Sequence, residues 1–126
     1  MAQAQAKLSK LDSRSLDAPD EQRTPPKTTV DVVHLEGYTL GRFTFEPGWR
    51  WSECVKPAVG TDTCQVNHLG YVVSGRLTVR LNDGSQKTLQ AGEAYAIPAG
   101  HDAWVEGEEP FVGLEVMSAE EYAKPR

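Results

Sequence analysis

Between residues 30 and 117 the chain is a succession of short β-type runs, each ended by a turn signal, with no long helix among them. In the clearest run, Leu77, Val79 and Leu81 alternate with polar residues, and the Asn-Asp-Gly that follows is typical of a hairpin turn. Short strands at such close spacing, about nine or ten of them, are typical of a sandwich or a closed barrel. The sequence therefore predicts an all-β fold.

The two ends of the 126-residue chain differ from this β-rich part. Residues 1–29 are polar and contain three prolines, which predicts a disordered or extended N-terminal tail. Residues 118–126 begin with Ser-Ala-Glu-Glu, a capping box that predicts a short C-terminal helix. We expect one β domain over residues 30–117 between these two terminal segments.

Charge and hydropathy limit the classes of partner. The net charge is −5 at pH 7, which disfavours a nucleic acid or an anionic membrane surface as partner. No apolar run approaches the roughly 18 residues needed to cross a bilayer. The N-terminus lacks the apolar segment of a secretory signal, so we expect a cytoplasmic protein that binds a small molecule.

The segment from Gly92 to Trp104, GEAYAIPAGHDAW, contains the first candidate site residue. Pro98 and Gly100 predict a tight reversal, because proline fixes φ and glycine accepts positive φ. Such a turn places His101 at the start of the next strand and at the mouth of a barrel. In the alternative interpretation, His101 is a solvated residue beside the turn.

Two segments resemble motifs of a known family. Gly92, five residues, then Pro98-x-Gly100 and His101 resemble the second sequence motif of the cupins. Residues 68–75, HLGYVVSG, resemble the second half of the first cupin motif, where a metal-binding residue stands seven positions before a glycine. The resemblance to small single-domain bacterial cupins implies a jelly-roll β-barrel with a cavity open at one end. It also implies a homodimer.

The chain departs from the cupin pattern at most of the metal-binding positions. His68 stands where typical cupins have a glutamate. When three residues are counted between the His-x-His pair and that position, Asp62 and Cys64 stand at the two histidine positions. Ala103 stands at the usual histidine of the second motif, with His101 two residues earlier. A shift of two residues along a strand keeps the same face, so His101 is still expected to point inward.

Two functions follow from these residues. In the first, His68 and His101, with Cys64 and Asp62, hold a divalent metal ion in a metal-dependent enzyme, and a thiolate among the ligands favours Zn or Fe. In the second, the cavity binds or senses a small polar molecule without metal, or His68 and His101 act as acid and base in an isomerase or lyase. Candidates for contact with that molecule are the residues Arg42, Trp49, Trp51, Tyr71, Tyr95 and Trp104.

Each candidate also has a structural interpretation. Trp49, Trp51 and Trp104 can serve barrel packing alone, and a short strand is expected to hold Trp49 and Trp51 on one side. Tyr71 is also consistent with a core position, Asp62 with a turn, and Arg42 with a solvated or cross-strand-paired residue.

Overall fold

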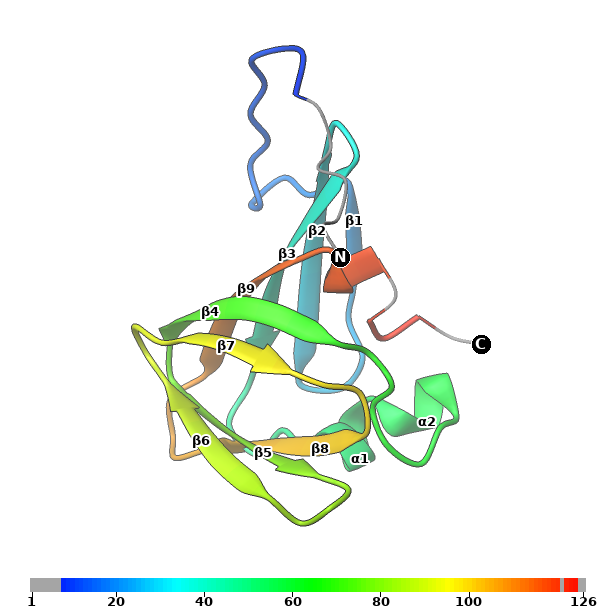
Figure 1. Cartoon of the computed structure of the whole chain (residues 1–126), viewed down its shortest axis with the longest axis vertical. Helices are drawn as coiled ribbons and strands as arrows, with labels where there is room; N and C mark the ends of the chain where they lie inside the picture. Colours follow the sequence, from blue (N-terminus) through cyan, green and yellow to red (C-terminus); the bar gives the residue numbers. More distant parts are fainter. Residues whose placement is uncertain (1–7, 121, 125–126) are drawn as a thin grey trace, which may run out of the picture.

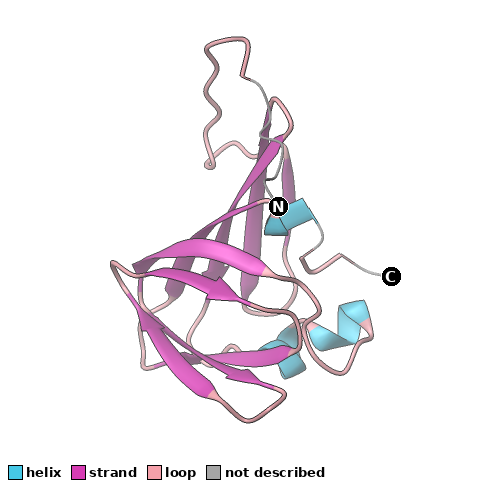
Figure 2. Cartoon of the chain, in the orientation of Figure 1, coloured by secondary structure: helices cyan, strands magenta, loops and turns pink. Residues whose placement is uncertain are grey.

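The computed structural model describes residues 8–120 and 122–124 and consists mainly of β-strands (Figure 2). The elements in chain order are β1 (Glu21–Arg23), β2 (Thr28–Leu35), β3 (Tyr38–Phe45), α1 (Trp51–Cys54), α2 (Lys56–Val59), β4 (His68–Ser74), β5 (Arg76–Leu81), β6 (Gln86–Gln90), β7 (Ala94–Ile97), β8 (His101–Glu106), β9 (Phe111–Val116) and the 3-10 helix η1 (Ser118–Glu120). The predicted all-β class is confirmed.

The strands form two antiparallel sheets that face each other across the core (Figure 1). The larger sheet has the order β1-β2-β3-β9-β4-β7, and the smaller sheet has the order β6-β5-β8. Strands β3, β9 and β4 are neighbours although long stretches of sequence separate them. This arrangement brings the starts of β4 and β8 to the same end of the barrel.

The alternation of side chains on β3 decides what fills the barrel. Phe43 and Phe45 point inward and are buried, whereas Arg42 and Thr44 point outward. The Trp49 ring stacks on the Phe45 ring with 3.8 Å between centroids, and its Nε1 donates a hydrogen bond to Thr28 Oγ1 at 2.8 Å. Aromatic side chains therefore occupy much of the space between the sheets.

The sheet begins earlier in the chain than expected. Strand β1 and the start of β2 lie within residues 1–29, which the sequence analysis assigns to a tail, because β1 pairs with β2 in antiparallel register. Residues 8–20 contain no helix or strand and include a turn closed by the Ala18 N–H and the Ser15 carbonyl at 3.1 Å, whereas residues 1–7 lie outside the described part of the chain.

Helix α1 replaces the strand that the sequence analysis expects around Trp51. The carboxylate of Asp102 accepts a hydrogen bond from the Ser52 backbone N–H at 3.1 Å at the start of this helix. Trp51 and Cys54, three positions apart on the helix, are both buried. Of the predicted C-terminal helix, residues 118–120 form η1, Glu121 of the capping box lies outside the described residues, and residues 122–124 are not helical.

None of the helices in the described residues has the length and apolar character needed to span a bilayer.

Candidate metal centre in the barrel

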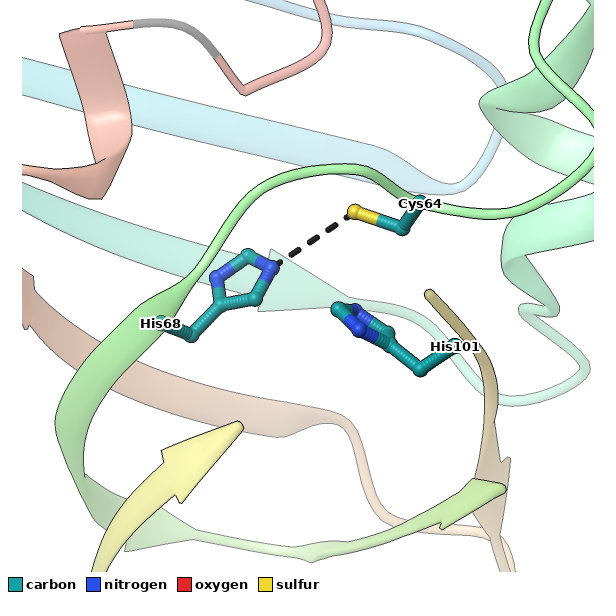
Figure 3. Close-up of side chains that lie close together, drawn as sticks. All are labelled: Cys64, His68 and His101. Carbon is teal, nitrogen blue, oxygen red and sulfur yellow. Dashed lines mark hydrogen bonds between the residues drawn. The ribbon is translucent and has the colours of Figure 1, made fainter. Parts of the chain in front are cut away.

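Three buried side chains meet at one end of the barrel, and they come from two segments of the chain (Figure 3). His68 opens β4 and His101 opens β8. Cys64 lies in the loop before β4, where its backbone N–H bonds to the carbonyl of His101 at 2.8 Å. Gly100 N–H bonds to the Cys64 carbonyl at 2.7 Å, so the loop is fixed to β8 on both sides of the thiol.

The three ligand atoms lie close enough to share one ion. One nitrogen of each histidine and the Cys64 sulfur all lie within 4.8 Å of one another. Sγ of Cys64 is 3.6 Å from Nε2 of His68, and the two imidazole centroids are 5.2 Å apart. The relative exposures of Cys64, His68 and His101 are 2%, 6% and 2%, so the group is shielded from water.

Hydrogen bonds on the far side of each ring settle the histidine tautomers. Nδ1 of His68 lies 2.6 Å from Glu115 Oε1, and Nδ1 of His101 lies 2.7 Å from the carbonyl oxygen of Pro98. A carboxylate and a carbonyl can only accept, so both Nδ1 atoms carry hydrogen. Nε2 of each ring is therefore the atom left to bind a metal, and metal-binding histidines in proteins are usually supported in this way.

Glu115 is buried with 4% exposure, and three neighbours donate to its carboxylate. Oε1 accepts from His68 Nδ1 and from the Ser118 hydroxyl, and Oε2 accepts from the Tyr95 hydroxyl at 2.6 Å. A buried carboxylate needs such partners to remain charged. Glu115 is thereby fixed in position and in turn fixes the His68 ring.

The pKa values of the thiol and the imidazole are shifted in opposite directions, so that the thiol becomes the stronger acid of the two. Burial raises the pKa of Cys64, but hydrogen bonds to His101 and His68 outweigh it and lower the pKa to about 6. Burial lowers the pKa of His68, but the charge of Glu115 and the hydrogen bond to Cys64 raise it to about 10. The thiolate is thus favoured near neutral pH, and a metal ion would displace the proton between sulfur and nitrogen.

One thiolate sulfur and two imidazole nitrogens fit a divalent transition metal. Zinc and iron accept this mixture of soft and intermediate donors, whereas magnesium and calcium prefer oxygen. Three protein ligands leave a fourth position for water or a substrate. These donors therefore pass the chemical test for a transition-metal site.

A cavity of about 20 Å³ adjoins these ligands. Besides His68, His101 and Glu115, its lining residues are Phe43, Phe45, Trp49, Trp51, Leu77, Ile97, Ala103 and Tyr122. A space of this size holds about one water molecule. The walls are mainly aromatic and aliphatic.

The predicted site residues divide between this cavity and the outer surface. Trp49 and Trp51 line the cavity, and Trp51 does so from a helix. Tyr95 is buried, with its hydroxyl bound to Glu115. Ala103 and His101 both line the cavity, which confirms that a shift of two residues retains the inward face.

Strand geometry places three predicted contact residues outside the cavity. Arg42 points away from Phe43 and pairs with Asp31 at 3.1 Å. Trp104 lies on the outer face of β8, where the Arg50 guanidinium carbon is 4.4 Å from its ring centroid. Tyr71 is 47% exposed, so neither the expected cavity role nor a core position is correct.

Asp62 does not join the metal ligands. Its side chain is fully exposed in the loop after α2, with the nearest cation, Lys56 Nζ, 3.9 Å away. The loop turns between Asp62 and Cys64, so only Cys64 reaches the barrel interior.

The profile of the cupin domain family matches residues 55–117, which is half of the chain and contains all three candidate ligands. This protein is a cupin. The family that the two sequence motifs suggest is thereby confirmed, and it accounts for the two-sheet barrel.

Solved structures agree with this assignment at the level of the fold. A protein of unknown function from Rhizobium leguminosarum is 24% identical with a TM-score of 0.62, and the match covers 86% of this cupin and 96% of that chain. An uncharacterised double-stranded β-helix protein from Klebsiella pneumoniae is 18% identical, with a TM-score of 0.57 and coverages of 87% and 86%.

A Bacillus subtilis oxalate decarboxylase variant is 24% identical with a TM-score of 0.51, over 82% of this cupin but only 29% of that chain. At such identities the likeness concerns the fold alone. No curated protein matches the sequence.

Two cavity residues with polar groups, Glu115 and Tyr122, are absent from the sequence-based candidates. Glu115 could be found from strand periodicity. It lies two positions after Gly113 and four after Phe111 on β9, and the period of two places all three on the inward face. Tyr122 has no such signal, since it follows the last strand and its position depends on how the chain folds back over the barrel.

Proposed function

We propose that this cupin binds a small molecule beside a divalent metal ion held by Cys64, His68 and His101. The observation that carries the proposal is the convergence of three buried ligand atoms within 4.8 Å, with both histidine rings oriented by acceptors at Nδ1. Zinc or iron suits these donors best. When bound, the ion would supply Lewis acidity to a ligating oxygen or activate a bound water.

The residues of the chain contribute orientation and the exclusion of water. Glu115 holds the His68 ring so that Nε2 faces Cys64. Trp49, Trp51 and Phe43 surround the open side of the ligands with apolar surface, which strengthens electrostatic interactions there. This supports a metal-dependent oxidoreductase, isomerase or lyase.

Elemental analysis of untagged protein tests this proposal. We expect close to one equivalent of zinc or iron per chain, or the uptake of one equivalent after incubation with the ion. Less than about 0.2 equivalents under both conditions would rule out a metal centre.

A second candidate function requires no metal. The hydrogen-bonded series Cys64, His68 and Glu115 resembles the arrangement of nucleophile, base and orienting carboxylate in covalent catalysis. The same histidine also has the partners for proton transfer to a bound ligand. The elemental analysis separates this candidate from the first, because it predicts a metal-free active protein.

We further propose that the protein is a homodimer formed through the outer face of β4 and β9. Leu69, Tyr71 and Val73 of β4 are exposed on this face, next to Leu114 and Val116 of β9. These side chains carry no charge, which suits contact between two copies that each carry −5.

We also propose a cytoplasmic location, which accords with two cysteines, Cys54 and Cys64, that are free and buried.

A further inference from the structure

Residues 118–120 and 122–124, which follow β9, fold back over the barrel and fill its open end. Helix η1 packs against β3 and β2, and Ala119 is fully buried there (Figure 1). Gly41 provides the space, because a Cβ at that position would lie 2.5 Å from Ala119 Cβ. The absence of a side chain at Gly41 therefore permits the C-terminal residues to dock.

The Tyr122 ring occupies the space in front of the candidate metal ligands. Its exposure is 2%, and its centroid lies 4.8 Å from that of Phe43 and 5.4 Å from that of His68. Only about 20 Å³ of the cavity remains beside it. Withdrawal of a ring of this size would open about 150 Å³, enough for a benzene-sized molecule.

Among the contacts that hold the Tyr122 segment in place, two hydrogen bonds come from one side chain of β1, and the backbone beside them is strained. Nη1 of Arg23 donates to the carbonyl oxygens of Ala119 and Tyr122, each at 2.7 Å. Met117 and Ala123, on either side of the segment, have φ of +71° and +58°. Residues with a Cβ adopt this region at a cost, so the docked position depends on its contacts.

The walls of the cavity indicate which molecules could replace the ring. No lysine or arginine lines the cavity in the described residues, and the carboxylate of Glu115 is already on the inner side. The imidazole of His68, the cation at this end of the cavity, is already paired with that carboxylate, so an anionic ligand would lack a free cationic partner. Phe43, Phe45, Trp49 and Trp51 instead present aromatic surface to a flat, uncharged guest.

We propose that the cavity binds a small uncharged aromatic molecule, which takes the place of the Tyr122 ring. The C-terminal residues are then a built-in competitor that must withdraw before the ligand enters. The proposal rests on the proposed function only in taking the barrel cavity as the ligand site, and it requires no metal.

Binding of p-cresol, the tyrosine side chain as a free molecule, tests the proposal. Calorimetric titration compares the full-length wild type, Arg23→Ala, and Arg80→Ala as a control arginine that is exposed on the smaller sheet. We expect binding of one p-cresol per chain, about tenfold tighter in Arg23→Ala because the open form is more populated, and unchanged in Arg80→Ala. p-Toluate, which has a carboxylate in place of the hydroxyl, is expected not to bind.

NMR of the wild type locates the ligand. The Ala119 methyl and Tyr122 ring signals are expected to move as p-cresol saturates the protein. The proposal is overturned by any of three results: no p-cresol binding in any variant up to about 10 mM, equal affinity for p-toluate, or saturation without movement of these signals.

Equal p-cresol affinity in wild type and Arg23→Ala also contradicts the proposal. Arg23→Lys, which loses the paired donors but keeps the charge, replaces Arg23→Ala if the latter does not fold. Metal content is measured on the same samples. A protein that contains metal but does not bind p-cresol refutes this inference alone. A protein that binds p-cresol but contains no metal refutes only the metal centre.

Discussion

His68 and Glu115 lie 47 positions apart in the sequence, yet Nδ1 of the imidazole and Oε1 of the carboxylate are 2.6 Å apart inside the barrel. The pairing exists because β4 and β9 are neighbouring antiparallel strands, with Gly70 opposite Glu115. The carboxylate selects the tautomer whose Nε2 is available to a metal, and orients that nitrogen.

Glu115→Gln should weaken metal binding by about 10- to 100-fold while leaving the three ligands in place. The amide oxygen can still accept from His68, but the charge that supports its Nδ1–H is lost. Competition with a chromophoric chelator measures the dissociation constant. Glu109→Gln, in the exposed turn before β9, removes the same charge and should leave the constant unchanged. Equal affinities for wild type and Glu115→Gln would show that Glu115 has no role in ligand orientation.

Cys64→Ser should reduce the bound metal to less than about 0.1 equivalents, because a serine hydroxyl is a poor ligand at neutral pH. The other buried thiol gives a matched control, and Cys54→Ser should retain the full equivalent. In the cobalt-substituted protein, the sulfur-to-metal charge-transfer band should disappear only in Cys64→Ser. If Cys64→Ser retained the metal and Cys54→Ser lost it, the metal-binding sulfur would be that of Cys54 and not that of Cys64.

Metal at 100 times its dissociation constant should also stabilise the wild type by about 2.7 kcal/mol.

Much of the site was predictable from motif spacing and strand periodicity. The Pro-Gly turn places His101 at the start of β8, and the next inward residue is Ala103. The same period of two shows why Tyr71 and Trp104 are outside the cavity: each lies an odd number of positions from the histidine on its own strand. Alternation within β3 likewise separates Arg42 from Phe43.

Other features depend on tertiary contacts that local patterns do not contain. Trp51 lies in a helix because Asp102, on another element, accepts from the Ser52 N–H at its start. Cys64 reaches the site only through its backbone pairing with His101. The position of Tyr122 follows from the small residue at Gly41, which lies far earlier in the chain.

Tyr71→Asp should convert the proposed dimer into single chains, since it places a charge in the middle of the apolar outer face. Sedimentation equilibrium should give about twice the mass of one chain for the wild type and the mass of one chain for the variant. Lys87→Asp, on the exposed strand β6 of the other sheet, should remain dimeric. A wild type that sediments as single chains would refute the dimer, and a dimeric Tyr71→Asp would place the interface elsewhere.

Gly41→Ala should destabilise the fold by about 1–3 kcal/mol, because the added methyl meets Ala119 and Phe43 in a packed interior. Ala119→Gly removes one of these two obstacles. The double variant should therefore lose less stability than the two single variants together, with a coupling of about 0.5–3 kcal/mol. Urea unfolding of the four proteins gives the free energies of unfolding from which the coupling is calculated. Recovery should be partial, because Phe43 Cε1 would still lie 2.8 Å from the new methyl. Strictly additive losses would mean that Ala119 is not seated on Gly41, and that the C-terminal residues do not close the barrel in this way.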